Sequence, residues 1–414
     1  MNNLYLFTNQ FPFCNGENCF GDPFLINEVP YLEVKFDNIY FIPRKEGDHL
    51  RDIPTNSHVI CLHDNVVQNP STKIRYLLNC VSFLRIRFIK NIFLCLKHPI
   101  DTRYSFFFKI KQLISYMYAS LILRDNLKID SADSNFFYCF WLNEWTLMLS
   151  LLKEIGYIKH FISRAHARGD LYLDKYNNTI LQEYVVSQID KIYPVSEYGE
   201  EYLCDRYPYF KEKIKVQYLG TRDFNLNPFI KSDEFVIVSC STVDERKRVQ
   251  IIVDALMLLQ FDVRWIHFGD GVLLDTIKEK VKALPSNVIY ELKGHTKNEV
   301  VMKFYQQQPV NLFINTSSEE GLPVSLMEAA SFGIPLLATD ASGNREIVNN
   351  DTGILLKQDA EATVIADSIT TFRLSKKNTL DFRLEVRKYW EKKFSAEVNY
   401  PNFINDFTSL NNYK

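Results

Sequence analysis

The sequence has almost no net charge and no cysteine pattern of a metal site. Its 48 Lys and Arg residues face 50 Asp and Glu residues, which leaves a formal charge of −2. No global basic field therefore favours a nucleic-acid partner. The eight cysteines form no Cys-x-x-Cys pair, which argues against a zinc site. They are scattered, with only Cys14 and Cys19 close together, and unpaired cysteines are typical of a reducing compartment, so we expect a cytoplasmic protein.

Long apolar runs and a secretion signal are also missing. No window of about 18 uninterrupted apolar residues occurs, so the sequence predicts no transmembrane helix. Residues 1–13, MNNLYLFTNQFPF, lack a basic segment followed by a long apolar one, so we expect no signal peptide. What the sequence does have is size: 414 residues, of which 46% are hydrophobic and 24% charged, suit a globular protein with two domains.

The second half alternates short apolar runs with amphipathic stretches. Short strands between longer helices are typical of a parallel sheet covered on both faces, so residues 229–385 are predicted to form one α/β domain. The expected strands are 234–242, 263–271, 287–294, 310–317 and 334–340, and the expected helices are 249–259, 272–284, 298–307 and 323–333.

The first half alternates less clearly. Residues 191–203 are predicted to form a strand and then a helix that Ser196 caps. The Pro- and Asn-containing segment 221–233 is the best candidate for a linker, so a second α/β domain is predicted over 1–228. The last segment, 386–414, is predicted to be helical. Further strands are expected at 4–9, 38–44, 58–63 and 214–220, and a helix at 24–36.

Residues 81–113 differ from the rest in composition. They contain seven Lys and Arg and one acid, Asp101, among many Phe, Ile and Leu residues. A basic and apolar stretch of this kind can lie on an anionic membrane. Alternatively, it forms a helix pair that covers the N-terminal sheet with its basic face in water, because both kinds of helix are equally amphipathic.

Residues 317–340, SSEEGLPVSLMEAASFGIPLLATD, follow the end of a predicted strand, where doubly wound sheets bind ligands. Gly321 permits close backbone approach and Pro323 suits a first helical turn, whose free N–H groups attract phosphate. Glu320 could accept hydrogen bonds from sugar hydroxyls, and Glu328 from a ribose diol. Hydroxyls on both sides of a phosphate describe a nucleotide sugar. Alternatively, Glu319 and Glu320 merely favour the helix dipole, and Glu328 lies in solvent.

This segment resembles the donor-site signature of glycosyltransferase family four, retaining GT-B enzymes of the glycosyl transferases group 1 type. In that pattern a Glu precedes Gly-Leu-Pro and a second Glu follows after seven residues. The resemblance implies an α/β GT-B fold with two Rossmann-like domains facing a central cleft. It also implies Glu320 as a catalytic residue, and donor-binding roles for Gly321, Leu322, Pro323 and Glu328. Residues 338–348 resemble the next turn, where the family favours Gly-Gly and this sequence has Ser342-Gly343.

Residues 239–256 resemble the family's phosphate loop, which carries an early Arg and a Lys before the helix. Lys247 matches the Lys, Thr242 stands where the Arg is expected, and Arg246 or Arg248 could replace it. A departing nucleoside diphosphate gains negative charge, which a fixed cation stabilises. Alternatively, this basic run is a solvated charge cluster. Gly294 lies in a segment, 292–296, that resembles the one bordering the nucleotide base.

Two segments of the first half extend the resemblance. Residues 162–176 resemble a family segment whose His lies near the anomeric carbon of the donor, which implies a catalytic role for His166. Asp170 and Tyr172 also fit that segment, although a lone His is more often structural. Residues 11–32 resemble the Gly-rich turn after the first strand, so Gly21 and Asp22 are expected to face the acceptor.

The mechanism expected from this resemblance needs no metal and no other cofactor. The sequence has no Asp-x-Asp triplet, so Lys247 and the helix N-terminus are expected to neutralise the diphosphate. Retention of anomeric configuration is implied by the family. Because no nucleophile for double displacement is identifiable, we favour front-face attack assisted by the leaving phosphate. Residues 386–414 are expected to cross back to the N-terminal domain, and domain closure would exclude water.

The predicted function is therefore hexosyl transfer from a nucleotide sugar to a saccharide acceptor. The basic stretch 81–113 suggests a lipid-linked acceptor at the inner face of the cytoplasmic membrane, as in bacterial O-antigen, capsule or exopolysaccharide (lipopolysaccharide-type) synthesis. One alternative is a nucleotide-sugar epimerase of the same fold, which would need further acid/base carboxylates in the N-terminal domain. Another is a non-catalytic scaffold subunit of an envelope-assembly complex, which would have no use for the donor signature.

Overall fold

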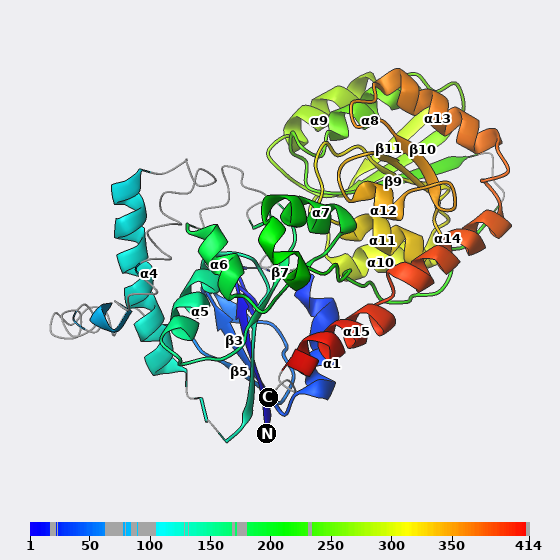
Figure 1. The fold of residues 1–414 in the computed structure, drawn as a ribbon. Helices are drawn as coiled ribbons and strands as arrows, with labels where there is room; N and C mark the ends of the chain where they lie inside the picture. Colours follow the sequence, from blue (N-terminus) through cyan, green and yellow to red (C-terminus); the bar gives the residue numbers. More distant parts are fainter. Residues whose placement is uncertain are drawn as a thin grey trace. The chain divides into compact units, whose positions relative to one another are not determined.

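The chain forms two compact units (Figure 1). The first unit comprises Met1–Gln217 and Tyr400–Lys414, and the second unit comprises Tyr218–Asn399. The computed structural model describes residues 1–16, 22, 24–62, 78, 80–83, 89, 105–127, 129–130, 132–167, 170–171, 180–230 and 234–410. Gly21, Tyr172 and most of the basic stretch 81–113 lie outside these residues.

The second unit is built on a six-stranded parallel sheet in the order β11-β10-β9-β12-β13-β14, as the alternation of its sequence predicts. Strands buried on both faces read as continuous apolar runs, and β9 is such a run, FVIVSC. The strands are β9 Phe235–Cys240, β10 Val263–Phe268, β11 Val288–Leu292, β12 Leu312–Asn315, β13 Leu336–Thr339 and β14 Gly353–Leu356.

Helices cover both faces of this sheet. In Figure 1, α8, α9 and α13 lie on one side, and α10, α11, α12 and α14 lie on the other. Their apolar sides and the strands enclose one hydrophobic core that includes Trp265. The helices are α8 Val249–Leu256, α9 Leu274–Lys280, α10 Asn298–Gln307, α11 Val324–Ser331, α12 Asn344–Ile347, α13 Ala362–Leu374 and α14 Leu380–Lys393.

The first unit contains a second six-stranded parallel sheet, in the order β5-β3-β1-β6-β7-β8. Its strands are β1 Asn2–Thr8, β3 Asn38–Pro43, β5 Ser57–Val59, β6 Ser134–Cys139, β7 Ile162–Ala165 and β8 Lys191–Pro194. A two-stranded ribbon pairs β2 Phe13–Cys14 with β4 His49–Leu50. The prediction of a strand at 214–220 is wrong: Lys215 and Gln217 donate hydrogen bonds to β8 carbonyls, but only Ile214 forms a bridge.

Helices cover this sheet as well. The helices α4, α5 and α6 lie on one side in Figure 1, and α1 and α15 lie on the other. Ser196 caps α7 as predicted, because its hydroxyl accepts a hydrogen bond of 3.0 Å from the Gly199 amide. The helices are α1 Leu25–Lys35, α4 Phe106–Asn126, α5 Glu144–Glu154, α6 Gln182–Gln188, α7 Glu197–Arg206 and α15 Ala396–Ser409.

A buried ion pair and its neighbours join four elements of the first unit, β6, β7, α1 and α15. The Arg164 guanidinium on β7 lies 3.2 Å from the carboxylate of Glu28 on α1, and neither side chain is exposed. The same guanidinium donates to the Tyr138 hydroxyl at 2.9 Å and stacks 3.8 Å from the ring centroid of Phe403 on α15. The C-terminal helix is therefore part of the core of the first unit, because Phe403, Ile404 and Phe407 pack into it.

The units divide after Gln217, whereas the linker expected from the sequence is 221–233. The reason is that residues 221–227 are hydrogen-bonded within the second unit. The Trp390 indole donates to the Thr221 hydroxyl at 2.7 Å, and the Asn227 amide donates to the Gln308 carbonyl at 2.8 Å. Similarly, α14 lies in the second unit, and only Tyr400 and the residues after it belong to the first.

The cysteines differ in part from the expectation that they are unpaired. Cys14 is disulfide-bonded. Free thiols are found at Cys61, Cys80, Cys139, Cys204 and Cys240.

Candidate functional site

The second unit has a pocket at the point where the order of the strands in its sheet reverses direction. Strand β9 lies between β10 and β12, and ligands of doubly wound sheets bind beyond the carboxyl ends of strands at such a point. The pocket holds about 190 Å³ of empty space, part of it open to solvent. Its walls come from the ends of β9 and β12 and from the loop before α8, with Cys240, Lys247 and Asn315 among the lining residues.

Lys247 and Glu320 form an ion pair beside this pocket. The Lys247 ammonium lies 2.5 Å from a carboxylate oxygen of Glu320, and the Arg246 guanidinium lies 3.7 Å from the other. The Asn315 side-chain amide donates to the same carboxylate at 3.3 Å. The structure thus brings together three residues predicted from the sequence and adds Asn315, which was not predicted. Its signal in the sequence is the run of small polar residues, Asn315–Ser318, at the end of a strand.

The Glu320 carboxylate is ionised although it is buried. Burial alone would raise its pKa, but the charge and hydrogen bond of Lys247, with smaller effects of Ser317 and Arg246, lower the pKa below its ordinary value. Glu320 is only 6% exposed, and its carboxylate pairs with the Lys247 ammonium. Because Lys247 lines the pocket, its ammonium can be shared between Glu320 and an anion that enters.

Arg246 and Arg248, the two candidates for the missing loop arginine, differ in their surroundings. Arg246 points to the Glu319–Glu320 segment, and it donates to the Glu319 carbonyl at 3.3 Å. Arg248 has a left-handed backbone, and its guanidinium donates to the carbonyls of Thr316, at 2.7 Å, and Gln358. Arg248 therefore ties loops together, whereas Arg246 adds its charge to that of Lys247. Thr242, at the family's Arg position, donates to Asp244 at 3.0 Å.

Glu328 is the second acid of the signature and is also buried, with 8% of the residue exposed. It lies on α11 and accepts a hydrogen bond of 2.7 Å from the Asn298 amide of α10. Burial raises the pKa of the Glu328 carboxyl to about 7, although the Asn298 hydrogen bond opposes the shift. The alternative that Glu328 is a solvated acid is therefore wrong. A buried carboxylate with one hydrogen-bond partner keeps free acceptor positions for hydroxyl groups.

The turn after β13 lies directly against the Glu320–Pro323 loop. A Cβ added to Gly343 would lie 1.9 Å from the Gly321 carbonyl oxygen, so only glycine fits there. Ser342 has a φ of 51°, a left-handed conformation that explains why the family favours Gly at its position. Leu322 is buried, and Pro323 is the N-cap of α11 rather than its first residue.

Gly343→Ala is expected to weaken nucleotide binding by about tenfold or more, because the new methyl group must displace the Gly321 carbonyl and the loop that carries Glu320. Isothermal titration with a nucleoside diphosphate checks this expectation. The matched control is Ser342→Ala in the same turn. This substitution only removes a hydroxyl group and adds no atom that could displace the Gly321 carbonyl. Equal affinities of the two variants would contradict the predicted contact between the turn and the loop.

Gly294 follows β11, two strands away from β9 in the sheet. Its φ is 63°, and its carbonyl accepts a hydrogen bond of 2.9 Å from the Gly269 amide. A Cβ added there would meet no atom within 4 Å. The backbone at Gly294 is thus open for a ligand to approach.

His166 of the first unit is a buried, neutral histidine. Its Nε2 donates to the Phe140 carbonyl at 2.8 Å, and its ring packs 4.3 Å from the Trp141 ring centroid. Burial, with the nearby charge of Arg164, lowers the pKa of His166 to about 3. With Nε2 protonated, Nδ1 is an acceptor, and it has no hydrogen-bond partner in the described part of the chain. His166 can therefore accept a hydrogen bond through Nδ1, but it is not protonated near neutral pH and cannot act as a general acid.

Asp22 has its hydrogen-bonding capacity taken up by the protein. Its carboxylate accepts from the backbone amides of Gln10 and Phe11, each at 2.8 Å, and from the Trp141 indole. It also accepts from the Asn9 amide at 3.0 Å. Asp22 therefore fixes the turn after β1, and it has little capacity left for the acceptor contact expected from the sequence.

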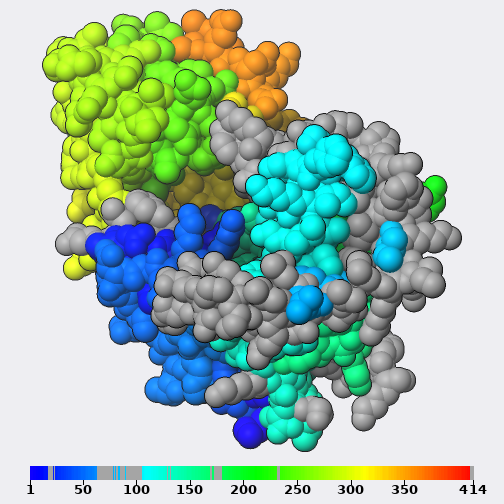
Figure 2. All heavy atoms as spheres, turned by 90° about the vertical axis from the view of Figure 1, so that its left-hand side faces the viewer, coloured from blue at the N-terminus to red at the C-terminus, as the bar shows by residue number. Residues whose placement is uncertain are grey.

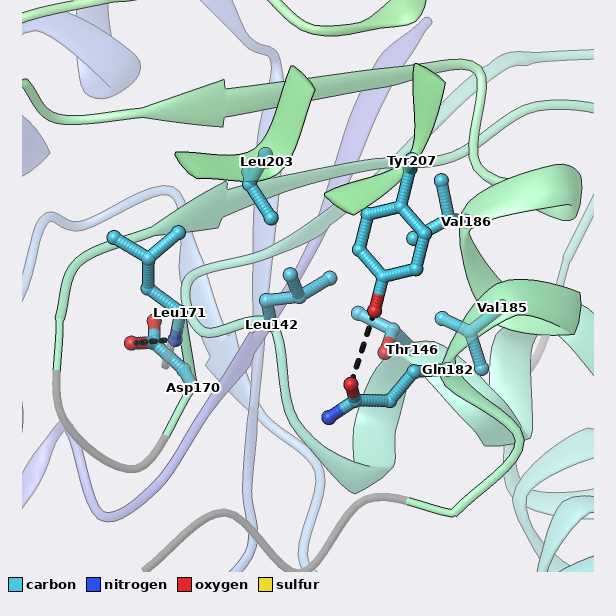
Figure 3. A pocket seen from close by; sticks show the side chains of 9 residues that line it. All are labelled: Leu142, Thr146, Asp170, Leu171, Gln182, Val185, Val186, Leu203 and Tyr207. Carbon is cyan, nitrogen blue, oxygen red and sulfur yellow. Dashed lines mark hydrogen bonds between the residues drawn. The ribbon is translucent and has the colours of Figure 1, made fainter. Parts of the chain in front are cut away.

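A separate pocket lies in the first unit among α5, α6 and α7 (Figure 3), with about 270 Å³ of empty space. Its wall is mostly apolar, with Leu142 and Val185 among its members. The polar groups within it already pair: the Tyr207 hydroxyl donates to Gln182 at 3.0 Å, and Asp170 accepts from the Leu171 amide at 2.7 Å. Asp170, which fits the family segment, also accepts from the His166 amide at 2.8 Å and so orders that loop.

Comparison with known proteins agrees with the predicted fold and with the resemblance of the second unit to glycosyltransferases. Residues 222–392 match the model of the family described as glycosyl transferases group 1. A relative from Escherichia coli K12, the putative colanic acid biosynthesis glycosyltransferase WcaL, is 24% identical over 237 residues. These are 53% of this chain and 57% of the relative. The curated relatives that the chain matches are covered over only 25% to 57% of their length.

Solved structures match over the whole chain. The lipopolysaccharide outer core galactosyltransferase WaaB superposes with a TM-score of 0.66 at 17% identity and covers 99% of both chains. Anabaena Alr3699/HepE in complex with UDP-glucose gives a TM-score of 0.64 at 14% identity, over 99% of this chain and 100% of that one. The predicted GT-B class of two Rossmann-like units is confirmed.

Proposed function

Because residues 222–392 match the model of the glycosyl transferases group 1 family, we propose that the chain transfers a sugar from a nucleotide-sugar donor to a saccharide acceptor. The observation that carries this proposal is the pair of cations, Lys247 and Arg246, beside a pocket at the β9–β12 edge. Fixed cations stabilise the charge that a nucleoside diphosphate gains as it leaves. Glu328 is proposed to accept the ribose hydroxyls, and Glu320 to position the sugar and Lys247.

Retention of anomeric configuration is proposed to follow from front-face attack. The departing phosphate takes the proton of the acceptor hydroxyl as the glycosidic bond to the diphosphate breaks and the new one forms. Cys240 lines the pocket, but burial and then the nearby Glu328 raise the pKa of its thiol to about 12, so it stays neutral and is a poor nucleophile. Lys247 and Arg246 supply the positive charge that a bridging metal would supply, and no metal requirement is proposed.

His166 is proposed to act through Nδ1, as an acceptor of a hydrogen bond from a substrate hydroxyl. The expected consequence is a positioning role, because a histidine with a pKa of about 3 does not carry a proton at neutral pH.

The acceptor is proposed to be a lipid-linked saccharide, used in the synthesis of a bacterial surface polysaccharide such as O-antigen, capsule or exopolysaccharide. Lipid linkage would bring the reaction to the inner face of the cytoplasmic membrane. This part of the proposal rests on the basic, apolar composition of residues 81–113. A glycosyltransferase relative named for colanic acid biosynthesis is consistent with it.

Product analysis tests the proposal against its two alternatives. The purified chain is incubated with UDP-, GDP-, dTDP- and ADP-sugars, with and without a polyprenyl-linked saccharide. A transferase forms a glycosylated lipid with retained configuration only when the acceptor is present. An epimerase converts the free nucleotide sugar without an acceptor, and a scaffold subunit changes neither. Either of the last two results would overturn the proposed function.

Donor affinity is expected to rise with pH through the pKa of Glu328. The ionised carboxylate accepts hydrogen bonds from two hydroxyls, whereas the protonated acid must donate one, so the donor favours the ionised form. With a pKa of about 7 in the free protein, binding should be about tenfold tighter at pH 8 than at pH 6. Titration calorimetry with an intact nucleotide sugar measures this, because its diphosphate diester does not titrate in this range.

The matched control is Glu328→Gln, which is isosteric and cannot ionise. Its affinity should be lower at pH 8 and independent of pH. A wild-type affinity that is flat between pH 6 and pH 8 would contradict the assignment of Glu328 to the ribose.

A further inference from the structure

The start of α4 presents an apolar and basic surface that the proposed donor site does not use. Phe107 is 83% exposed, Phe106 45%, Phe108 40% and Ile114 46%. Lys111 is exposed between them. Figure 2 shows the cyan first part of α4 on the face turned to the viewer. We call Phe106, Phe107, Phe108, Lys111 and Ile114 the α4 tip.

The side of α4 opposite the α4 tip is packed into the core of the first unit. The opposite side of α4 carries Leu113, Met117 and Leu121, which are buried in that core. The Ser105 hydroxyl caps the helix by accepting a hydrogen bond of 3.3 Å from the Phe108 amide. Phe107, Lys111 and Ile114 lie on one side of the helix by their spacing of four and three residues. The exposed rings therefore extend from an ordered helix whose other face is already occupied.

The sequence that forms the α4 tip contains a cation and no acid. No acid occurs from Thr102 to Arg124, and the first turn of α4 contains none. Among the cations of α4, Lys111 is exposed at the α4 tip, whereas Lys109 is buried and Arg124 lies in the last turn, where it pairs with Asp125. The amino end of a helix adds a partial positive charge. An anionic partner is thus favoured, and a basic one is disfavoured.

We propose that the α4 tip docks on an anionic phospholipid bilayer. Successive residues of a helix point about 100° apart, so no single flat protein surface can bury three consecutive Phe rings. A fluid bilayer can, because its headgroup and acyl boundary adapts to each ring, while Lys111 reaches the lipid phosphates. None of the helices in the described part of the chain is long and apolar enough to cross a bilayer, so this docking is peripheral.

This inference rests on the proposed function, because it names the surface that would bring the enzyme to a lipid-linked acceptor. The observations that support it do not involve the donor site. The test is flotation of the full chain with phosphatidylcholine vesicles, with and without phosphatidylglycerol. We expect binding at low salt only with the anionic vesicles, and a loss of about tenfold or more in Phe107→Ser/Lys111→Glu. The matched control is Tyr209→Ser, because Tyr209 of the same unit is 90% exposed and lies outside α4.

Each result decides the inference. It is overturned if the wild-type chain does not float with anionic vesicles, or if the double variant floats as well as the wild type. It is also overturned if Phe107→Ser instead abolishes a concentration-dependent dimer seen by light scattering, since the α4 tip would then bind a second copy. Nucleotide titration of the same variants separates the two proposals: flotation without any nucleotide binding would leave the docking intact and remove the proposed function.

Discussion

Lys247→Ala is expected to lower kcat/KM for the donor about a thousandfold. The ammonium of Lys247 lines the pocket and already pairs with the buried Glu320 carboxylate at 2.5 Å. Its removal takes away the nearest cation from the leaving diphosphate and leaves Glu320 with Arg246 at 3.7 Å. Loss of one group that stabilises developing charge typically costs about 10²–10³ in rate, and the misplaced acid adds to this. Initial rates at varied donor concentration measure the effect.

Two control variants separate catalysis from folding. Lys280→Ala removes a lysine that pairs with Asp254 on the surface of the same unit, and it should leave kcat/KM unchanged. Lys247→Ala alone leaves the buried Glu320 carboxylate without its nearest cation and should also destabilise the second unit. Lys247→Ala/Glu320→Gln removes both charges, so it should be more stable than Lys247→Ala but equally inactive. Wild-type kinetics in Lys247→Ala would refute the assignment of this pocket to the diphosphate.

Arg164→Met is expected to destabilise the first unit by about 3–5 kcal/mol, because it leaves the carboxylate of Glu28 buried without its partner. The arginine also supports α15 through its stack on Phe403, so the C-terminal helix should loosen at the same time. Hydrogen exchange of β1, β6 and α15 peptides at increasing urea concentration reports the stability of this unit alone, without assuming two-state unfolding of the whole chain.

The companion variant is Arg164→Met/Glu28→Leu, which replaces both charges by apolar groups. It should be clearly more stable than Arg164→Met, since a fully apolar replacement leaves no charge buried. If the single and double variants unfold alike, the cost comes from lost packing of the arginine and not from the stranded carboxylate.

The second unit could be predicted well from the sequence because its strands are buried on both faces. Continuous apolar runs such as FVIVSC predict buried strands, and the segments between them repeat apolar residues with the period of a helix, so few other assignments of secondary structure are possible. In the first unit, residues 64–158 gave no such signal. Strand β6, SNFFYC, is rich in aromatics and has no β-branched residue. The helix α4 carries large apolar side chains on its exposed side as well as on its buried side, so its apolar residues do not follow a clear helical periodicity.

The site was predictable in its residue types but not in its pairings. The sequence places Lys247 and Glu320 in loops that follow strands, and Glu328 on the helix after the second of these loops. Their partners depend on side-chain contacts between distant segments, as in Lys247–Glu320 and Asn298–Glu328. Asp22 illustrates the limit, because only the folded turn after β1 brings three backbone amides and the Trp141 indole to its carboxylate.

The central claim is that the β9–β12 pocket binds a nucleotide sugar through Lys247. The most direct test is a thermal-shift titration of wild type and Lys247→Ala with UDP, GDP, dTDP and ADP, each with its sugar conjugates, in the presence and absence of EDTA. We predict that one nucleotide family stabilises the wild type, that EDTA does not remove the shift, and that Lys247→Ala abolishes it. No shift with any nucleotide, or an equal shift in Lys247→Ala, would contradict the claim.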